Sequence, residues 1–237
     1  PFIIFLCNEI CRKIEILMIP KKSLGQNFLN NEKILNQIIK YGNINEEDTI
    51  LEIGPGTGKL TEKIIELKPA KLIVVEKDKK LSQELNKKFN KKLIVINDDI
   101  LNCYYKFKFD KPIKVFGNLP YNISTKILTS FIKIDKLNTY VSKFFFVFQK
   151  EVADRITADP NTKQYGRLSI LTSWKMNRFK LFDIPPNSFY PVPKVWSSLI
   201  LLNPKEKVEK INKTKTLEHI TNIFFNQRRK MIGKPMK

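Results

Sequence analysis

Residues Leu51–Gly58 read LEIGPGTG, a short apolar segment that runs directly into a glycine-rich turn. The run Thr49–Gly54 has the β-branched, apolar character of a buried strand, and Leu60–Leu67 has the spacing of a helix. A strand, a glycine-rich turn and a helix in this order predict one unit of an α/β sheet. In such a sheet, ligands bind beside the turn, at the carboxyl end of the strand.

The spacing of the glycines bears on the kind of ligand. Gly54, Gly56 and Gly58 follow the pattern GxGxG, which is neither the GxGxxG of a dinucleotide site nor the ending of a phosphate-binding P-loop. Lys59 follows without the Ser or Thr that would hold magnesium. The glycines let the backbone approach a ligand closely, but phosphate is not the ligand that we expect.

The rest of the chain repeats the alternation of strands and helices, which predicts a Rossmann-like, mostly parallel sheet with right-handed crossovers. Two later segments on either side of a Pro-rich turn predict antiparallel strands at one edge of that sheet. The expected strands are Thr49–Gly54, Lys71–Glu76, Leu93–Ile96, Ile113–Gly117, Lys143–Gln149, Arg178–Ile184 and Val195–Leu202. The expected helices are 31–41, Leu60–Leu67, 81–89, 125–132 and 214 to about 231.

Acidic side chains stand at the ends of the next two strands. Glu76 follows Gly54 by twenty-two residues and can accept hydrogen bonds from both hydroxyls of a ribose. Asp99 follows the third strand and can accept from an exocyclic amine of the same nucleoside. Each acid alone also fits a helix cap or a solvated charge. Together with the glycine-rich turn, they predict a pocket for an adenosine that carries no phosphates.

This combination resembles the class I S-adenosylmethionine-dependent methyltransferases, with LEIGPGTG as the cofactor loop. Further motifs resemble the ribosomal RNA adenine N6-methyltransferase family, and within it the small-subunit dimethyltransferases. The resemblance extends from about Lys21 to Lys230 and rests on KKSLGQNFL, LEIGPGTG, GNLPYNIS, YGRLSI, SFYPVPKVWSSLILL and FNQRRK. It implies S-adenosyl-L-methionine as cofactor and transfer of two methyl groups to each of two adjacent adenosines. These adenosines lie in a hairpin loop near the 3′ end of small-subunit rRNA.

The resemblance also implies roles for individual residues. Residues near the N-terminus would cover the cofactor, Gly54 would lie against its methionine end, and Asn118 would lie between cofactor and substrate. Without the resemblance, residues 25–27 would read as a capped turn before the helix at 31. The implied cofactor-binding residues are Gln26, Asn27, Leu29, Gly54, Gly56, Glu76, Asp99 and Asn118.

The turn GNLPYNIS carries the implied methyl-transfer chemistry. An adenine N6 amine is a poor nucleophile, and the side-chain oxygen of Asn118 with the carbonyl of Leu119 can orient it by accepting its hydrogens. Pro120 favours an extended Leu119, and Tyr121 offers a ring for stacking. The target base would have to leave its stack to reach this turn. Phe189 would close the other face of the adenine, although a core aromatic at the start of a strand explains Phe189 equally well.

The composition favours a nucleic-acid partner. The chain has 43 Lys and Arg against 23 Asp and Glu, a net charge of +20, which suits a polyanion. A Lys-rich surface of general polarity is the alternative. By resemblance the partner is small-subunit rRNA or a small ribosomal subunit precursor. Arg228, Arg229 and Lys230 are the expected contacts to the RNA backbone, unless they form a solvated helix face.

The remaining features place limits on the class of protein. A single His and three Cys without a cluster spacing predict no metal site. No apolar run is long enough to span a membrane, so we expect a monomeric cytoplasmic enzyme, or an organellar one in a eukaryotic host. The expected domains are an extension (1–17), the methyltransferase domain (18–203) and the start of a helical RNA-binding domain (204–237). The family continues for several tens of residues beyond FNQRRK, so that last domain is expected to be truncated.

Three alternatives remain open at this point. A DNA adenine N6-methyltransferase would share the Asn-Pro-Tyr logic, but usually has Pro where Leu119 stands. A large-subunit methylase of the erythromycin-resistance type usually reads NIPY. A noncatalytic RNA-binding assembly factor would keep the fold without the chemistry, which the intact cofactor motifs oppose.

Overall fold

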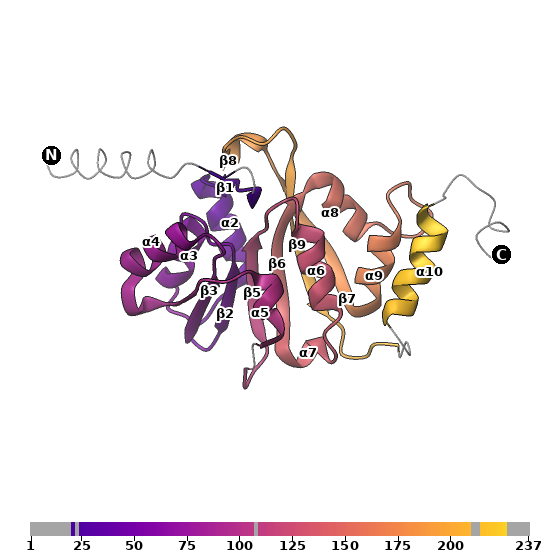
Figure 1. Ribbon diagram of the computed structural model, residues 1–237, viewed down its shortest axis with the longest axis horizontal. Coiled ribbons are helices and arrows are strands. Elements are labelled where there is room, and N and C mark those ends of the chain that lie inside the picture. Colours follow the sequence, from indigo (N-terminus) through magenta and orange to yellow (C-terminus); the bar gives the residue numbers. More distant parts are fainter. Residues whose placement is uncertain (1–19, 22–23, 107–108, 210–213, 227–237) are drawn as a thin grey trace, which may run out of the picture.

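The computed structural model describes residues 20–21, 24–106, 109–209 and 214–226 of the 237-residue chain (Figure 1). The expected extension, 1–17, lies outside the described residues. Arg228, Arg229 and Lys230 also lie outside them.

A seven-stranded sheet forms the centre of the protein, in the order β4-β3-β2-β5-β6-β9-β7. The five strands from β2 to β6 run parallel, and β9 runs antiparallel to both β6 and β7. The antiparallel pair that the sequence predicts is therefore present, with the later strand inserted between β6 and β7. The strands are β2 (Thr49–Ile53), β3 (Lys71–Val75), β4 (Ile94–Ile96), β5 (Ile113–Asn118), β6 (Val141–Gln149), β7 (Met176–Ile184) and β9 (Ser197–Pro204).

Helices cover both faces of this sheet because side chains alternate between its faces. In β6, Phe144, Phe146 and Phe148 belong to one core cluster, which also contains residues of α6 and α8. Phe145 and Val147 belong to the other, with residues of α2, α3 and α4. In Figure 1, α2, α3 and α4 gather at one end of the molecule and α8, α9 and α10 at the other.

The helices are α2 (Glu32–Gly42), α3 (Lys59–Glu66), α4 (Lys79–Phe89), α5 (Ile100–Cys103), α6 (Ser124–Ile132), α7 (Leu137–Tyr140), α8 (Lys150–Thr157), α9 (Arg167–Lys175) and α10 (Thr214–Asn226). Short 3-10 turns follow at Asn90–Lys92, Tyr104–Lys106 and Pro186–Ser188. All five expected helices are present, the last one within its described part. The sequence analysis did not predict α5, α7, α8 or α9.

A second, two-stranded sheet joins the N-terminal segment to the segment before β9. It pairs β1 (Phe28–Leu29) with β8 (Phe189–Tyr190) in antiparallel register, and the Asn30 amide extends the pairing by donating to the Ser188 carbonyl over 2.8 Å. This small sheet lies at the top of Figure 1. It brings together two segments that are 160 residues apart in sequence.

Within the described ranges, no helix has the length and apolar character needed to cross a bilayer, and no group of three potential ligands is arranged to hold a metal ion.

Candidate cofactor and methyl-transfer site

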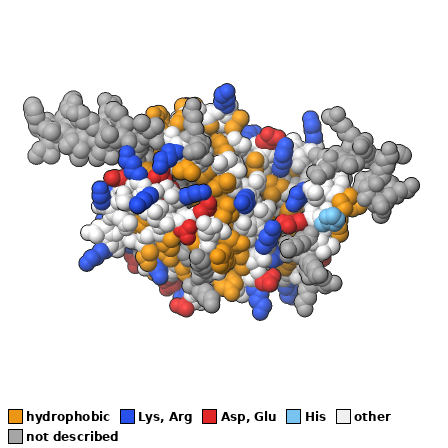
Figure 2. Space-filling view, in the orientation of Figure 1, with side chains coloured by type: hydrophobic (Ala, Val, Ile, Leu, Met, Phe, Trp, Pro, Cys, Tyr) orange, Lys and Arg blue, Asp and Glu red, His pale blue; other side chains and the backbone are white. Residues whose placement is uncertain are grey.

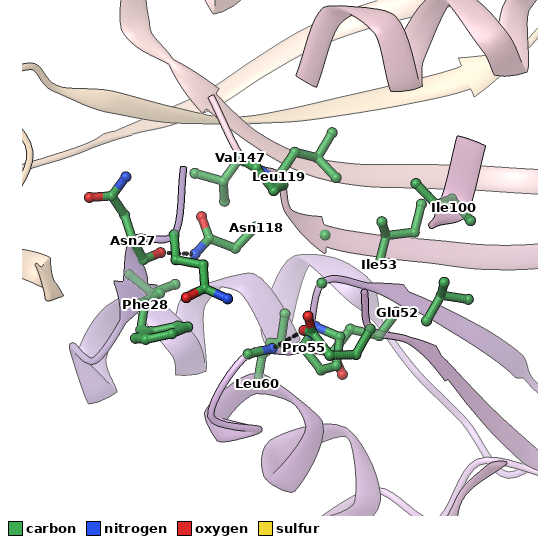
Figure 3. A pocket seen from close by; sticks show the side chains of 18 of the residues that line it. Asn27, Phe28, Glu52, Ile53, Pro55, Leu60, Ile100, Asn118, Leu119 and Val147 are labelled. Carbon is green, nitrogen blue, oxygen red and sulfur yellow. Dashed lines mark hydrogen bonds between the residues drawn. The ribbon is translucent and has the colours of Figure 1, made fainter. Parts of the chain in front are cut away.

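One pocket lies at the carboxyl ends of β2, β3 and β5, where the parallel strands meet their following turns (Figure 3). The N-terminal segment before α2 forms another of its walls. Nine of the residues that the sequence analysis selected line this pocket: Gln26, Asn27, Leu29, Gly54, Gly56, Glu76, Asp99, Asn118 and Leu119. Tyr121 and Phe189 are not among its lining residues. The parallel sheet gathers the residues from Gly54 to Leu119 at one edge, as expected for ligand sites at strand ends, and the N-terminal segment adds Gln26, Asn27 and Leu29.

Two glycines of the turn after β2 have backbones that a side chain would disturb. Gly54 has φ +66°, and a Cβ there would point into open pocket space, with the Asn118 carbonyl as its nearest neighbour at 3.9 Å. Gly56 has φ +57°, and a Cβ would meet the Phe28 ring at 2.7 Å. Gly54 therefore leaves space for a ligand, whereas Gly56 lets the N-terminal segment pack on the turn.

Glu76 presents a buried carboxylate to the pocket from the end of β3. Its two oxygens accept from the Gly56 amide over 3.1 Å and from the Asp78 amide over 2.9 Å. Burial raises the pKa of Glu76, and these backbone hydrogen bonds lower it only in part. The two amides fix the orientation of the carboxylate, and each oxygen retains a lone pair with which it can accept from a ligand hydroxyl.

Asp99 caps a helix and also lines the pocket. It is the N-cap of α5 and accepts from the Leu101 amide over 2.9 Å. Its other oxygen accepts from Lys77 over 2.9 Å. Burial raises the pKa of Asp99, but the hydrogen bonds from Lys77 and Leu101 outweigh it and leave the pKa below its ordinary value. Asp99 is therefore a held anion at the pocket wall.

Asn118 is the last residue of β5, and a hydrogen bond fixes its amide. Its Nδ2 donates to the Asn27 carbonyl over 2.7 Å, shown as a dashed line in Figure 3. This bond identifies the nitrogen, so Oδ1 remains available as an acceptor. Leu119 follows with only 1% of its surface exposed. Both groups that the sequence analysis selected to orient an amine are thus carried by the same turn.

Tyr121 lies on that turn but is anchored to the antiparallel part of the sheet. Its hydroxyl makes a 2.6 Å hydrogen bond with the hydroxyl of Ser197, the first residue of β9. Burial raises the pKa of Tyr121, and the bond to Ser197 opposes this rise. The phenol is therefore neutral, and its ring is held on the turn Gly117–Ser124, which we call the transfer turn.

The N-terminal segment before α2, which we call the covering segment, lies over the pocket and makes contacts on both sides of it. Lys21 forms a 2.8 Å ion pair with Asp78, which caps α4, and its amide donates to the Gln26 side chain over 2.8 Å. Gly25, at φ +63°, lies so close to Asn122 that a Cβ would be 2.8 Å from its Oδ1. The segment ends at Asn31, which caps α2. A capped turn before this helix, the alternative interpretation from the sequence, can therefore occur together with a position over the pocket.

Phe189 lies in the core and is not among the residues that line the pocket. Its side chain is 3% exposed and packs in the core cluster that contains Leu29, Leu35 and Val147. This placement favours the alternative interpretation, a core aromatic at the start of a strand. The physical reason is the β1–β8 pairing, which sets Phe189 opposite Leu29 and turns both side chains inward.

Glu52 is a residue of the pocket that the sequence analysis did not select. It is 1% exposed, and its Oε2 accepts a 2.7 Å hydrogen bond from Thr61 of α3. Burial raises the pKa of Glu52 to about 8, the Thr61 bond lowers it, and the charge of Glu76 raises it further. The sequence feature that could have identified Glu52 is an acidic residue within the otherwise apolar strand TILEI. Burial thus favours the protonated form of Glu52 near neutral pH.

The raised pKa of Glu52 predicts a specific pH dependence of stability. The folded protein holds this proton up to about pH 8, while an unfolded glutamate releases it near pH 4.5. The contribution to stability is thus complete below about pH 4.5 and is lost as pH rises through about 8, by up to about 1.4 kcal/mol per pH unit. We expect Glu52→Gln, which imitates the neutral acid, to remove this slope. Urea unfolding of both proteins at several pH values measures it, and parallel profiles would contradict the assignment.

The strand order, the reversed β9 and the glycine-rich turn after β2 together define a class I methyltransferase. The chain matches, over residues 19–237, the family described as ribosomal RNA adenine dimethylase. It belongs to this family. The fold class and the family that the sequence motifs indicate are thereby confirmed.

Similar proteins agree with this membership. Ribosomal RNA small subunit methyltransferase A of Pelagibacter ubique (strain HTCC1062) is 51% identical over 215 residues, which are 91% of this chain and 82% of the relative. A dimethyladenosine transferase from Plasmodium falciparum has a TM-score of 0.76 at 30% identity, covering 88% of this chain and 74% of its own. The 23S rRNA methyltransferase ErmE shares the fold, with a TM-score of 0.67 at 24% identity, covering 83% of this chain and 76% of its own.

Proposed function

We propose that the protein transfers methyl groups from S-adenosyl-L-methionine to N6 of two adjacent adenosines in a hairpin loop near the 3′ end of small-subunit rRNA. The observation that carries this proposal is the position of the Asn118–Leu119 turn, which opens on the same pocket as Glu76 and Asp99. A site for an amine substrate is thereby adjacent to a site for an adenosine. The family and the name of the relative from Pelagibacter ubique support the choice of RNA.

The residues present fit the cofactor. Glu76 supplies acceptors for the ribose hydroxyls, and Asp99 supplies an acceptor for the adenine amine. The apolar side chains of Ile53 and Ile100 line the same pocket, and Gly54 leaves space that a Cβ would fill. Gln26, Asn27 and Leu29, with Gly56, would complete the enclosure from the covering segment and the turn.

The chain's own contribution to the reaction is to hold the amine. The cofactor supplies an electrophilic methyl group on a sulfonium. Asn118 Oδ1 and the Leu119 carbonyl accept the two N6 hydrogens, which directs the nitrogen lone pair towards the pocket. With the cofactor bound, the methyl–sulfur bond would break as the C–N bond forms, leaving a neutral thioether, and the N6 proton would then pass to solvent, so no strong base is needed. Positioning of this kind contributes up to roughly 7–11 kcal/mol to catalysis in well-oriented systems. The Tyr121 ring is the surface for stacking the extruded base.

A second groove, next to the transfer turn, suits the RNA backbone. It lies among α6, α8, α9 and α10 and is lined by four cationic side chains and one acidic one: Lys126, Arg155, Lys163, Arg167 and Glu151. On the face of the molecule that Figure 2 shows, Lys and Arg side chains are spread out, with Asp and Glu among them. Lys126 follows the GNLPYNIS turn within two residues. We assign the groove to phosphates, and a role of Arg228, Arg229 and Lys230 in the same binding stays a prediction.

The groove predicts how RNA binding depends on salt. We expect Lys126→Ala to weaken binding of the hairpin RNA and to reduce the slope of log affinity against log salt by about 1, because one phosphate contact is lost. Fluorescence anisotropy with labelled RNA at several salt concentrations measures the slope. Lys91→Ala, an exposed lysine beyond the opposite edge of the sheet, is the matched control. Equal slopes for both variants would contradict the assignment.

We propose that residues 18–203 form the methyltransferase domain and that 204–237 begin a helical RNA-binding domain. The end of β9 at Pro204, with α10 as the next described element, supports this division. We propose a monomer that acts in the cytoplasm, where small subunits are assembled.

Methyl transfer with defined acceptors tests the function. The protein is incubated with isotopically labelled cofactor and, separately, small subunits lacking the modification, large subunits lacking theirs, and DNA. We expect label only in small-subunit RNA, recovered as N6,N6-dimethyladenosine. Label in large-subunit RNA or DNA would overturn the proposed substrate. Binding of small subunits without any label would instead identify a noncatalytic assembly factor.

A further inference from the structure

The segment Tyr190–Trp196, YPVPKVW, connects β8 to β9 and carries an unusual density of exposed apolar side chains. Tyr190 is 54% exposed, Val192 63%, Val195 44% and Trp196 50%. It rises above the sheet at the top of Figure 1. We call these seven residues the aromatic loop. A cluster of exposed apolar side chains on one loop is characteristic of a binding surface.

The aromatic loop is fixed at both ends beside the transfer turn. At its start, Tyr190 pairs with Phe28 of the covering segment. At its end, the Trp196 carbonyl accepts from the Lys150 amide over 2.8 Å. The next residue, Ser197, makes the 2.6 Å hydrogen bond to the Tyr121 hydroxyl. A ligand that reaches Tyr121 therefore meets the aromatic loop as well.

The chemistry of the aromatic loop selects one kind of partner. Lys194 is exposed and forms no ion pair with any residue that the structure describes. Exposed rings next to an unpaired cation match single-stranded nucleic acid, in which bases stack and phosphates are anionic. Pro191 and Pro193 restrict the backbone, so less freedom is lost when the rings bind.

We propose that Trp196 and Tyr190 stack on unpaired nucleobases of the RNA that flank the target adenosine, with Lys194 at the neighbouring phosphate. This proposal rests on the proposed function and extends it to the bases that are not methylated. The rings hold the loop nucleotides on both sides of the extruded base. The protein then selects RNA whose loop bases are unstacked, since stacking depends on the shape and accessibility of a base rather than on its identity.

A fluorescence experiment tests the contact directly. Trp174 and Trp196 are the only tryptophans of the chain, and Trp174 is tied to the Glu209 carbonyl by a 2.9 Å hydrogen bond. In a Trp174→Phe variant, Trp196 is the single tryptophan reporter. We expect saturable quenching of its emission on titration with the hairpin RNA. The reciprocal Trp196→Phe variant should show little quenching. Absence of quenching at RNA concentrations that saturate binding by anisotropy would overturn the proposal.

Kinetics with matched variants separates stacking from general apolar contact. We expect Trp196→Ala to raise the KM for small subunits roughly 5- to 150-fold, the range that corresponds to about 1–3 kcal/mol per stacked base, without lowering kcat or cofactor affinity. Trp196→Phe should retain most of the affinity, and Trp196→Leu should not. Phe179→Ala removes an equally exposed ring from β7 and is the control, for which we expect no change.

Each outcome has a definite meaning. If Trp196→Leu performs as well as wild type, the aromatic loop makes an apolar contact, such as one with a ribosomal protein, and the proposal is wrong. If wild type methylates no small subunits, the proposed function fails, while the fluorescence titration still decides whether Trp196 stacks on RNA.

Discussion

Replacing Asn118 with Ala is expected to lower kcat by at least about 10²–10³-fold, the loss seen when one preorganised polar group is removed from a reacting centre. The side-chain oxygen no longer accepts from the amine, so the lone pair is no longer directed. The same change removes the 2.7 Å hydrogen bond to Asn27. The cover over the pocket therefore loosens, and cofactor affinity should fall roughly 2- to 12-fold, corresponding to about 0.5–1.5 kcal/mol.

Single-turnover methylation and calorimetric titration of the cofactor measure these two effects separately. Asn177→Ala makes the same truncation at an exposed position of β7 and should change neither. Normal turnover by Asn118→Ala would remove Asn118 from the transfer step. Loss of cofactor binding equal to the loss of turnover would instead make it a residue that only secures the cover.

Replacing Glu76 with Ala is expected to lower the affinity for the cofactor strongly. Hydrogen bonds to a charged group contribute about 1.5–3 kcal/mol each, so loss of two ribose contacts weakens affinity roughly 10²–10⁴-fold. The Gly56 and Asp78 amides also lose their acceptor. The free energy of unfolding should therefore fall as well, by about 1–3 kcal/mol for each amide that stays buried without a partner.

Two further variants separate affinity from stability. Glu76→Gln keeps the shape and one acceptor, and we expect intermediate affinity and smaller destabilisation. Glu66→Ala removes an exposed glutamate at the end of α3 and should affect neither quantity. If Glu76→Ala binds the cofactor like wild type once its folding is verified, the ribose is not held at β3.

The sequence was sufficient for the parallel sheet because its strands are short, apolar and bounded by glycines or acids. It was less informative on the helices α8 and α9. YGRLSI was recognised only as a motif, and the Ser- and Thr-containing continuation of α9 lacks a clear apolar stripe. Its buried Ser169 and Thr172 are satisfied by backbone carbonyls of α8 and α9, such as those of Arg155, Leu168 and Ile156. The contacts to the Arg155 and Ile156 carbonyls of α8 are long-range, so no local sequence pattern indicates them.

The site could be predicted as far as strand ends determine it. Glu76 and Asp99 follow parallel strands and Asn118 ends one, so their convergence is a property of the fold. Two features depend on tertiary packing, so the sequence left the first open between two interpretations and did not indicate the second. The β1–β8 pairing turns the Phe189 ring into the core. The neutral state of Glu52 depends on burial beneath α3, where Thr61 is its hydrogen-bond partner.

The two-residue sheet of β1 and β8 joins a wall of the pocket to the aromatic loop, because Leu29 lines the pocket and Tyr190 begins the loop. Separating the two strands would expose Phe28 and Leu29, which are 8% and 6% exposed in this structure. Exposing each side chain costs about 1.5–3 kcal/mol, so the paired form predominates. The wall of the cofactor pocket and the surface that we propose for RNA are thus continuous through one short sheet.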